Sequence, residues 1–322
     1  MITRQAVFRL NSAATRYLSS CSNHIIPART FSTYLDDEDN MVDRQRVALV
    51  LGSSGCLGQE VVRHLGGDLD MKVIGADVIN KDEQESSKLD AFVQMPTFSQ
   101  PAAIADVTEA LVKGIAGVLE DDEEIDAIVC ASGGFMADPK LPSPDVADGE
   151  FSEAIKEYGD TLNKMMEMNL FPVLAANYAA NRFMAHQGLF VAIGATPALS
   201  PTPGILAYGL SKVGTHHFVQ TLGEITGNAM TTRSRRQKAR RLRKNSEYLD
   251  TLSVVGILPT TIDTPMNRKA MPEANFGDWT KPLDIAKEIG KWIEQPPLRP
   301  HSGSLVKVHP AKGGGASFLL AG

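Results

Sequence analysis

The chain has 322 residues, of which 43% are hydrophobic and 22% are charged, and its formal net charge is −6. Three cysteines without a CxxC pair argue against a disulfide framework and against a zinc site. No stretch approaches the ~20 apolar residues that a membrane-spanning helix needs, so we expect a soluble protein that binds neither membrane nor metal.

The first 35 residues contain four arginines, five serines and no acidic residue. This composition is typical of a mitochondrial presequence, and we interpret residues 1–33 as one. Within this segment, Arg29 to Ser32 resembles the cleavage site of a matrix protease. We therefore expect the protein in the mitochondrial matrix. The alternative is a tail without a targeting role on a cytoplasmic protein.

From residue 44 to residue 310, short apolar runs alternate with stretches of helical periodicity. This alternation indicates βαβ units and a parallel sheet. The sequence predicts one α/β domain with a doubly wound parallel sheet, the Rossmann fold, followed by a tail at 311–322. The expected strands are 47–51, 72–76, 91–95, 125–130, 189–193, 253–258 and 304–308. The expected helices are 57–65, 102–119, 151–186, a helix from about Tyr208, and 283–292. The helix at 151–186 is expected to bend or break near Pro172.

The first expected strand runs into a glycine loop with the spacing G-x-x-G-x-x-G. Such glycines permit a tight turn and let the backbone come close to a pyrophosphate. The phosphates would lie at the N-terminus of the following helix, where free N–H groups and the helix dipole favour anions. The residues expected to bind the cofactor in this loop are Gly52, Ser54, Gly55, Leu57 and Gly58.

Asp77 ends the second expected strand, 19 residues after Gly58. A carboxylate at this position can accept hydrogen bonds from both hydroxyls of the adenosine ribose and would repel a 2′-phosphate. The sequence therefore favours NADH over NADPH as the cofactor. The alternative interpretation of Asp77 is a helix cap or a solvated acid in a loop.

Tyr208 and Lys212 lie four residues apart at the start of a predicted helix. This spacing places both side chains on one face of the helix. A neighbouring ammonium group favours the phenolate, so we expect Lys212 to lower the pKa of Tyr208 below its usual value of about 10. The same lysine could hydrogen-bond the nicotinamide ribose. A pair with this spacing also occurs by chance in a structural role.

Residues 225–250 form a basic insertion, with eight basic residues and no acidic residue between 231 and 244. We interpret this segment as a solvated loop. It could alternatively dock an acidic partner or nucleic acid, or contact the chain's own acidic surface. The rest of the chain is strongly acidic, which argues against a general role in nucleic-acid binding.

Together these motifs resemble the short-chain dehydrogenase/reductase superfamily, from about Val47 to Val308. The resemblance implies that Tyr208, Lys212 and Asn169 are catalytic, with Asn169 holding a water of a proton relay, and that Tyr208 and Lys212 also contact the cofactor. It further implies cofactor contacts at Ala131 and Gly133. The family's usual serine, about 13 residues before the tyrosine, is here replaced by Ala195.

Within that superfamily, residues 204–212, 258–279 and 302–305 resemble the dihydropteridine reductase group, whose members also lack this serine. The resemblance implies NADH-dependent reduction of quinonoid 6,7-dihydropteridine to tetrahydropteridine by a homodimer that pairs through helices near 155–185 and 208–224. It also implies further contacts to the cofactor or the substrate. The residues concerned are Pro259, Ile262 and Thr264 for the cofactor, and Phe135, Thr196 and Tyr208 for the substrate.

Two other functions remain open from the sequence. One is a short-chain reductase that acts on another small carbonyl compound or on another pterin or folate. The other is a protein that senses a dinucleotide without turnover, although the intact Tyr208 and Lys212 argue against it.

Overall fold

The computed structural model describes residues 44–79, 88–97, 103–140, 148–226, 252–311 and 314–321. The predicted presequence at 1–33 and the basic stretch at 231–244 lie outside the described residues. From Gln45 onward the chain forms one compact unit. Within the described ranges, no helix combines the length and the apolar character needed to cross a bilayer.

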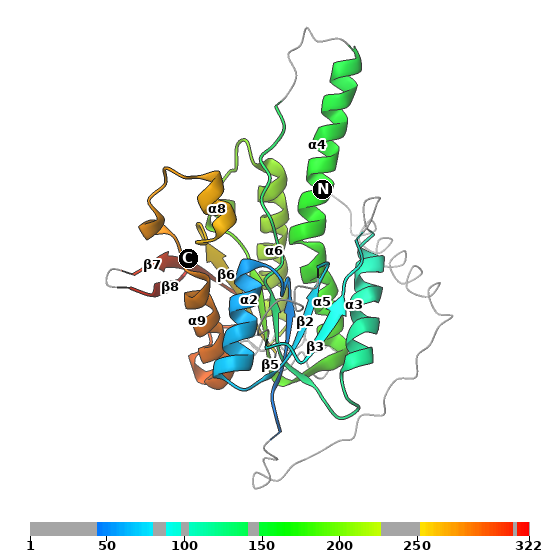
Figure 1. Cartoon of the computed structure of the whole chain (residues 1–322), viewed down its shortest axis with the longest axis vertical. Coiled ribbons are helices and arrows are strands. Elements are labelled where there is room, and N and C mark those ends of the chain that lie inside the picture. Colours follow the sequence, from blue (N-terminus) through cyan, green and yellow to red (C-terminus); the bar gives the residue numbers. More distant parts are fainter. Residues whose placement is uncertain are drawn as a thin grey trace, which may run out of the picture. The chain divides into compact units, whose positions relative to one another are not determined.

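An eight-stranded sheet forms the centre of this unit, with the strand order β3-β2-β1-β4-β5-β6-β7-β8 (Figure 1). Strands β1 to β7 pair in parallel, and β8 is antiparallel to β7. The strands are β1 (Val47–Leu51), β2 (Lys72–Asp77), β3 (Ala91–Gln94), β4 (Ile125–Cys130), β5 (Met184–Ile193), β6 (Ser253–Pro259), β7 (Ser304–Pro310) and β8 (Ala316–Leu320). The main helices are α2 (Cys56–Arg63), α3 (Ile104–Val118), α4 (Asp148–Asn169), α5 (Phe171–Phe183), α6 (Leu206–Ile225), α8 (Pro265–Ala270) and α9 (Pro282–Glu294).

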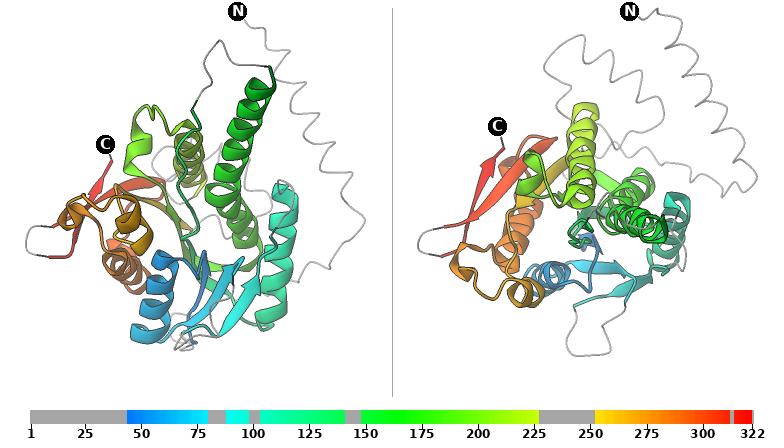
Figure 2. Two further views of the ribbon diagram at one scale, coloured as in Figure 1. Left: turned by 45° about the horizontal axis from the view of Figure 1, so that its top comes forward. Right: turned by 90° about the horizontal axis from the view of Figure 1, so that it is seen from above.

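Helices cover both faces of the sheet, which confirms the predicted doubly wound α/β fold (Figure 2). All five residues of β1 are buried, and alternate side chains enter two different cores. Leu49 faces the core with α3, α5 and α6, whereas Val50 faces the core with α2 and α9. A strand buried on both faces must be apolar throughout, which explains the uninterrupted run VALVL.

The long helix expected at 151–186 is interrupted in the structure. Helix α4 ends at Asn169, and α5 begins at Phe171 with Pro172 in its first turn. Proline has no N–H to donate within a helix and is tolerated only in the first turn, so the break falls where the sequence indicated it. Helix α5 then ends at Phe183, because residues from Met184 onward pair with β4 as part of β5.

The segment 311–322, predicted only as a tail, contains β8. This strand pairs with β7 from Val306 to Pro310 and thus extends the sheet by one strand. The five residues ASFLL are too few to show a clear period, so the pattern alone did not indicate a strand.

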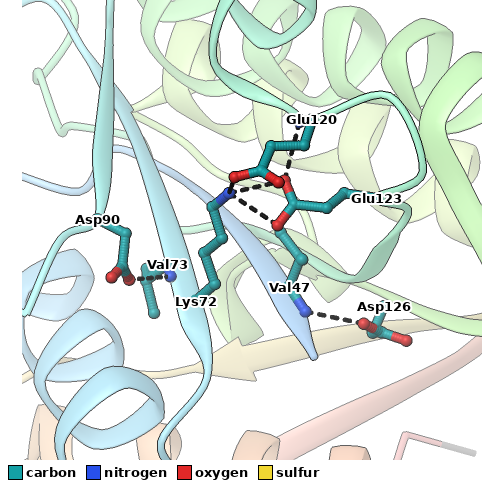
Figure 3. Close-up of polar contacts among 7 residues, drawn as sticks. All are labelled: Val47, Lys72, Val73, Asp90, Glu120, Glu123 and Asp126. Carbon is teal, nitrogen blue, oxygen red and sulfur yellow. Dashed lines mark hydrogen bonds and ion pairs between the residues drawn. The ribbon is translucent and has the colours of Figure 1, made fainter. Parts of the chain in front are cut away.

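The two edges of the sheet differ in their chemistry. At the amino ends of the strands, Lys72 contacts the carboxylate of Glu123 at 2.6 Å, and Asp90 accepts a hydrogen bond of 2.7 Å from the backbone N–H of Val73 (Figure 3). The order in which the strands are added to the sheet changes direction between the parallel neighbours β1 and β4, because β2 and β3 lie on one side of β1 and β4 to β7 lie on the other. Ligands of open α/β sheets bind at such a switch point, and the candidate site lies at the carboxyl ends of these strands.

Candidate active site

The glycine loop after β1 is tightly folded against its neighbours. Gly52 has φ +77°, and its N–H donates to the carbonyl of Ala76 at 2.8 Å. A Cβ atom on Gly52 would lie 2.4 Å from the nitrogen of Ser132, and one on Gly58 would lie 1.9 Å from the carbonyl oxygen of Gly52. Only glycine fits these two positions. Gly55, which precedes α2, makes no side-chain cap hydrogen bond, and the N-terminus of a helix favours an anion.

Asp77 is attached to this loop by its carboxylate. Its Oδ2 accepts a hydrogen bond of 2.9 Å from the backbone N–H of Ser54, and its Oδ1 accepts one of 2.7 Å from Val78. Ser54 also donates its hydroxyl to the carbonyl oxygen of Ile79. The half-buried carboxylate is therefore held beside the glycine loop, and its remaining lone pairs can accept bonds from ribose hydroxyls. The side chain of Leu57, in contrast, is buried in the core, so only its backbone could contact a cofactor.

The segment after β4 lies against the same loop. The N–H of Ala131 donates to the carbonyl of Leu51 at 2.9 Å. Gly133 has φ +153°, and a Cβ atom there would lie 2.7 Å from Oδ1 of Asn169 and 3.3 Å from Nζ of Lys212. The hydroxyl of Ser132 is buried without a hydrogen-bond partner among the described residues. The cradle of glycines and this unpaired buried hydroxyl fit a bound dinucleotide.

Asn169 ties this segment to helix α6. It lies at the end of α4 with 1% of its surface exposed. Its Oδ1 accepts from the N–H of Gly134 at 2.9 Å, and its Nδ2 donates to the hydroxyl of Ser211 at 2.9 Å. Ser211 in turn donates to the carbonyl of Tyr208 at 2.7 Å. Asn169 is thus a buried link between two parts of the site and not a surface amide.

Tyr208 and Lys212 occupy one face of α6, as the sequence predicted. Lys212 is buried, its Nζ donates to the carbonyl of Ile193 at 2.9 Å, and burial lowers its pKa to about 8. Burial raises the pKa of Tyr208 to about 12. The expected lowering of the pKa of Tyr208 by Lys212 is therefore wrong for this structure, because burial disfavours the charged phenolate. Tyr208 holds its proton at neutral pH and can donate it.

His216 is a site residue that the sequence reasoning missed. It is buried one turn beyond Lys212 on α6, and its Nε2 accepts a hydrogen bond of 3.1 Å from the N–H of Ala195. Burial, and secondly the charge of Lys212, lower the pKa of His216 to about 4. A Cβ atom on Gly194 would lie 2.5 Å from its Nε2. The sequence could have indicated His216, because its spacing of four residues from Lys212 places it on the same face of the helix.

Phe135 packs against Tyr208, and the segment after β5 contributes Ala195 and Thr196. The rings of Phe135 and Tyr208 lie 5.2 Å apart in an edge-to-face arrangement. Ala195 is buried and has no hydroxyl, and the neighbouring Thr196 donates its hydroxyl to the carbonyl of Leu258 at 2.7 Å. The hydroxyl hydrogen of Thr196 is therefore already used in a hydrogen bond to strand β6.

The turn after β6 contains the remaining predicted residues. Pro259 is the last residue of β6, and Ile262 forms a bridge with Thr280. The hydroxyl of Thr264 caps α8 by accepting from the N–H of Asn267 at 3.2 Å, and its hydrogen can still be donated to a ligand. Hydrogen bonds thus connect the glycine loop with Asp77, and the segment after β4 lies against the same loop. That segment in turn contacts Asn169 and Tyr208. No group of three or more His, Cys, Asp or Glu side chains in the described part of the chain could hold a metal ion.

Comparison with known proteins gives a family and curated relatives. The family model for short chain dehydrogenase matches residues 46–229. The chain is 32% identical over 260 residues to a dihydropteridine reductase of Dictyostelium discoideum, a match that covers 80% of this chain and 92% of the relative.

Solved structures of low sequence identity share the fold. A short chain dehydrogenase family protein from Francisella tularensis superposes with a TM-score of 0.56 at 15% identity, covering 82% of this chain and 97% of that one. An aldohexose dehydrogenase of Thermoplasma acidophilum gives 0.55 at 18% identity, with 82% and 92% covered. ElxO, solved with NADP bound, gives 0.56 at 16% identity, with 82% and 97% covered.

Proposed function

Since the chain belongs to the short-chain dehydrogenase family of oxidoreductases, we propose that it is an NADH-dependent reductase of quinonoid 6,7-dihydropteridine. The family binds nicotinamide dinucleotides and is usually oligomeric. The relative of 32% identity that is named dihydropteridine reductase supports this choice of substrate.

One combination of residues carries the proposal: the phenol of Tyr208 keeps its proton because burial raises its pKa, and Ala195, whose N–H donates to His216 of the same helix, has no side-chain hydroxyl. Reduction of a ketone develops negative charge on one oxygen, and a second hydroxyl donor beside the tyrosine stabilises it. Here Ala195 cannot donate, and Thr196 donates to Leu258 instead. A quinonoid dihydropterin is electron-poor and accepts hydride without a strongly localised oxyanion, so a single proton donor suffices.

In the proposed reaction, some of the site residues bind the cofactor and the substrate, and Tyr208 transfers a proton. A bound NADH supplies the hydride. The N–H groups after Gly55 would hold its pyrophosphate, and Asp77 would accept bonds from its ribose. Tyr208 would give a proton from Oη to the pterin ring, and Lys212 would hold the nicotinamide ribose. Phe135 presents an exposed aromatic face to a flat ring.

The test is an assay of NADH oxidation with freshly generated quinonoid dihydropterin, compared with a panel of ketones and with a blank that lacks enzyme. We expect turnover with the pterin, and we expect Tyr208→Phe to lower kcat by about 10²–10⁴-fold with little change in the Kd for NADH. Faster turnover of a ketone would assign the chain to carbonyl reduction. NADH binding without oxidation by any pterin would indicate a dinucleotide sensor.

The preference for NADH is proposed from the position of Asp77. Its carboxylate is fixed by Ser54 and Val78 at the end of β2, where it would repel the 2′-phosphate of NADPH. Asp77→Ser should therefore lower the ratio of kcat/KM for NADH to kcat/KM for NADPH. An unchanged ratio would show that Asp77 does not contact the ribose.

We also propose a homodimer that forms through α4, α5 and α6. These helices present exposed apolar side chains at spacings of three or four residues, so that each pair lies on one helix face. The residues are Phe151 and Ile155 on α4, Leu174 and Tyr178 on α5, and Leu210 and Val213 on α6. Figure 1 shows the first turns of α4 extending beyond the sheet, where such a partner would cover them.

A further inference from the structure

The N-terminus of α6 is capped from a distant part of the chain. The residue that precedes the helix, Ile205, has no side chain able to cap it. Instead the carboxylate of Asp138 accepts hydrogen bonds from the N–H groups of Leu206 at 2.6 Å and Ala207 at 3.1 Å. The N–H of Asp138 donates to the carbonyl of Gly204 at 2.9 Å. Three hydrogen bonds therefore join Asp138 to the turn that starts the helix of Tyr208.

The segment from Ala131 to Lys140 contains no helix or strand, so its position depends on such contacts. The N–H of Gly134 donates to Asn169 at 2.9 Å, and Asp138 attaches the segment again four residues later. Between these two attachments lies Phe135, whose side chain is 59% exposed. Burial therefore does little to fix the ring that lies 5.2 Å from the ring of Tyr208.

From this geometry we infer that Asp138 is a positioning residue, which holds Phe135 at a set distance from Tyr208 and so shapes the substrate side of the site. The inference rests on the proposed function only for the identity of the substrate. A carboxylate is suited to the task, because it accepts two N–H groups at once and because its charge is stabilised at a helix N-terminus. Asp138 acts through Phe135 and does not itself take part in the reaction.

The first experiment measures steady-state kinetics of Asp138→Ala and Asp138→Asn. In Asp138→Ala we expect kcat/KM for the pterin to fall by about 10- to 100-fold, mainly through KM, because a displacement of about 1 Å can cost that much. The KM for NADH should change little, since the glycine loop and Asp77 lie on the other side of Gly133 along the chain. The amide oxygen of asparagine can still accept an N–H, so Asp138→Asn should recover most of the loss.

The matched control is Asp90→Ala. Asp90 also accepts a backbone N–H, that of Val73, but at the opposite edge of the sheet (Figure 3). The variant should lose stability, as Asp138→Ala does, while its kcat and KM stay at wild-type values. An equal loss of kcat/KM in both variants would mean that Asp138 contributes only to stability, and this result would overturn the inference.

A double-mutant cycle then tests whether Asp138 acts through Phe135. If it does, Asp138→Ala should have a much smaller effect on kcat/KM for the pterin in a Phe135→Ala background than in the wild type. If the fold-losses of kcat/KM in the two single variants simply multiply in the double variant, the two residues act independently, which would contradict the inference. The comparison requires no crystal and uses the full chain.

Amide hydrogen exchange separates this inference from the proposed function. In Asp138→Ala the amides of Leu206, Ala207 and residues 134–137 should exchange faster, whereas in Asp90→Ala they should exchange as in the wild type. Unchanged exchange would overturn the inference whatever the activity. If the wild-type protein does not reduce quinonoid dihydropterin, the proposed function fails, and the exchange experiment still decides whether Asp138 anchors the segment.

Discussion

Lys212 is a buried ammonium whose hydrogen bond to the carbonyl of Ile193 only partly replaces solvent. Burial lowers its pKa to about 8, whereas burial raises the pKa of Tyr208 to about 12. The group that loses its proton first as the pH rises is therefore Lys212. If the ammonium holds the cofactor, as proposed above, kcat/KM should fall as the pH rises through about 8.

A pH profile of kcat/KM for NADH checks this assignment. In Lys212→Arg the guanidinium stays charged, because the pKa of arginine exceeds about 12. The fall of kcat/KM on the alkaline side of the profile should therefore shift to higher pH. If the variant turns over too slowly, the pH dependence of its Kd for NADH gives the same comparison. A fall that stays near pH 8 in Lys212→Arg would exclude Lys212 as the titrating group.

His216 makes a second prediction at the scale of one residue. Its pKa is lowered in the folded protein from 6.5 to about 4, by burial first and by the charge of Lys212 second. Between these pH values the unfolded chain binds a proton that the folded protein does not, so folding loses stability as the pH falls from about 6.5 to about 4.

His216→Gln tests this sign. The amide oxygen of glutamine can accept the N–H of Ala195 in place of Nε2, and it has no proton to gain in this range. The Tm of the variant should therefore fall less steeply than that of the wild type between pH 6.5 and pH 4. Parallel curves of Tm against pH would show that His216 does not titrate in this window.

At the scale of the element, the glycine loop and helix α2 depend on close backbone contacts. A Cβ atom on Gly58 would lie 1.9 Å from the carbonyl oxygen of Gly52, and backbone atoms cannot move aside as a flexible side chain can. Gly58→Ala should destabilise the protein by about 1–3 kcal/mol and weaken NADH binding by about tenfold or more. Thermal unfolding and titration with NADH measure the two effects.

Gly117 in α3 is the matched control for that substitution. Apart from its chain neighbours and the backbone of its own helix, no atom of the described residues lies within 4 Å of a Cβ built there, and the residue is helical. Alanine loses less conformational freedom than glycine on folding, so Gly117→Ala should raise stability by about 0.5–1 kcal/mol and leave NADH binding unchanged. Destabilisation by both variants would mean that contact at Gly58 is not the cause.

At the scale of the whole molecule, the exposed apolar residues of α4, α5 and α6 predict the subunit contact. Val213 is 45% exposed, although it neighbours the buried Lys212. A charge placed there would be buried without a partner in a dimer, so Val213→Asp should shift the protein to a monomer. Sedimentation or light scattering measures the change. Leu298→Asp, at another exposed leucine, should leave the dimer intact; dissociation in both variants would argue against this interface.

By itself the sequence determined the alternation of strands and helices, the glycine loop, Asp77 and the pair Tyr208 and Lys212. Each of these is a local pattern, because a buried strand, a tight turn or one face of a helix is specified by residues close together in the chain. The contacts of His216 with Ala195 and of Asp138 with α6 depend on the tertiary structure, since the first joins residues 21 apart in the sequence and the second joins residues 68 and 69 apart. No local pattern reports them. The tertiary structure also decided the pKa of Tyr208, because burial depends on everything packed around the ring and spacing along one helix does not report it.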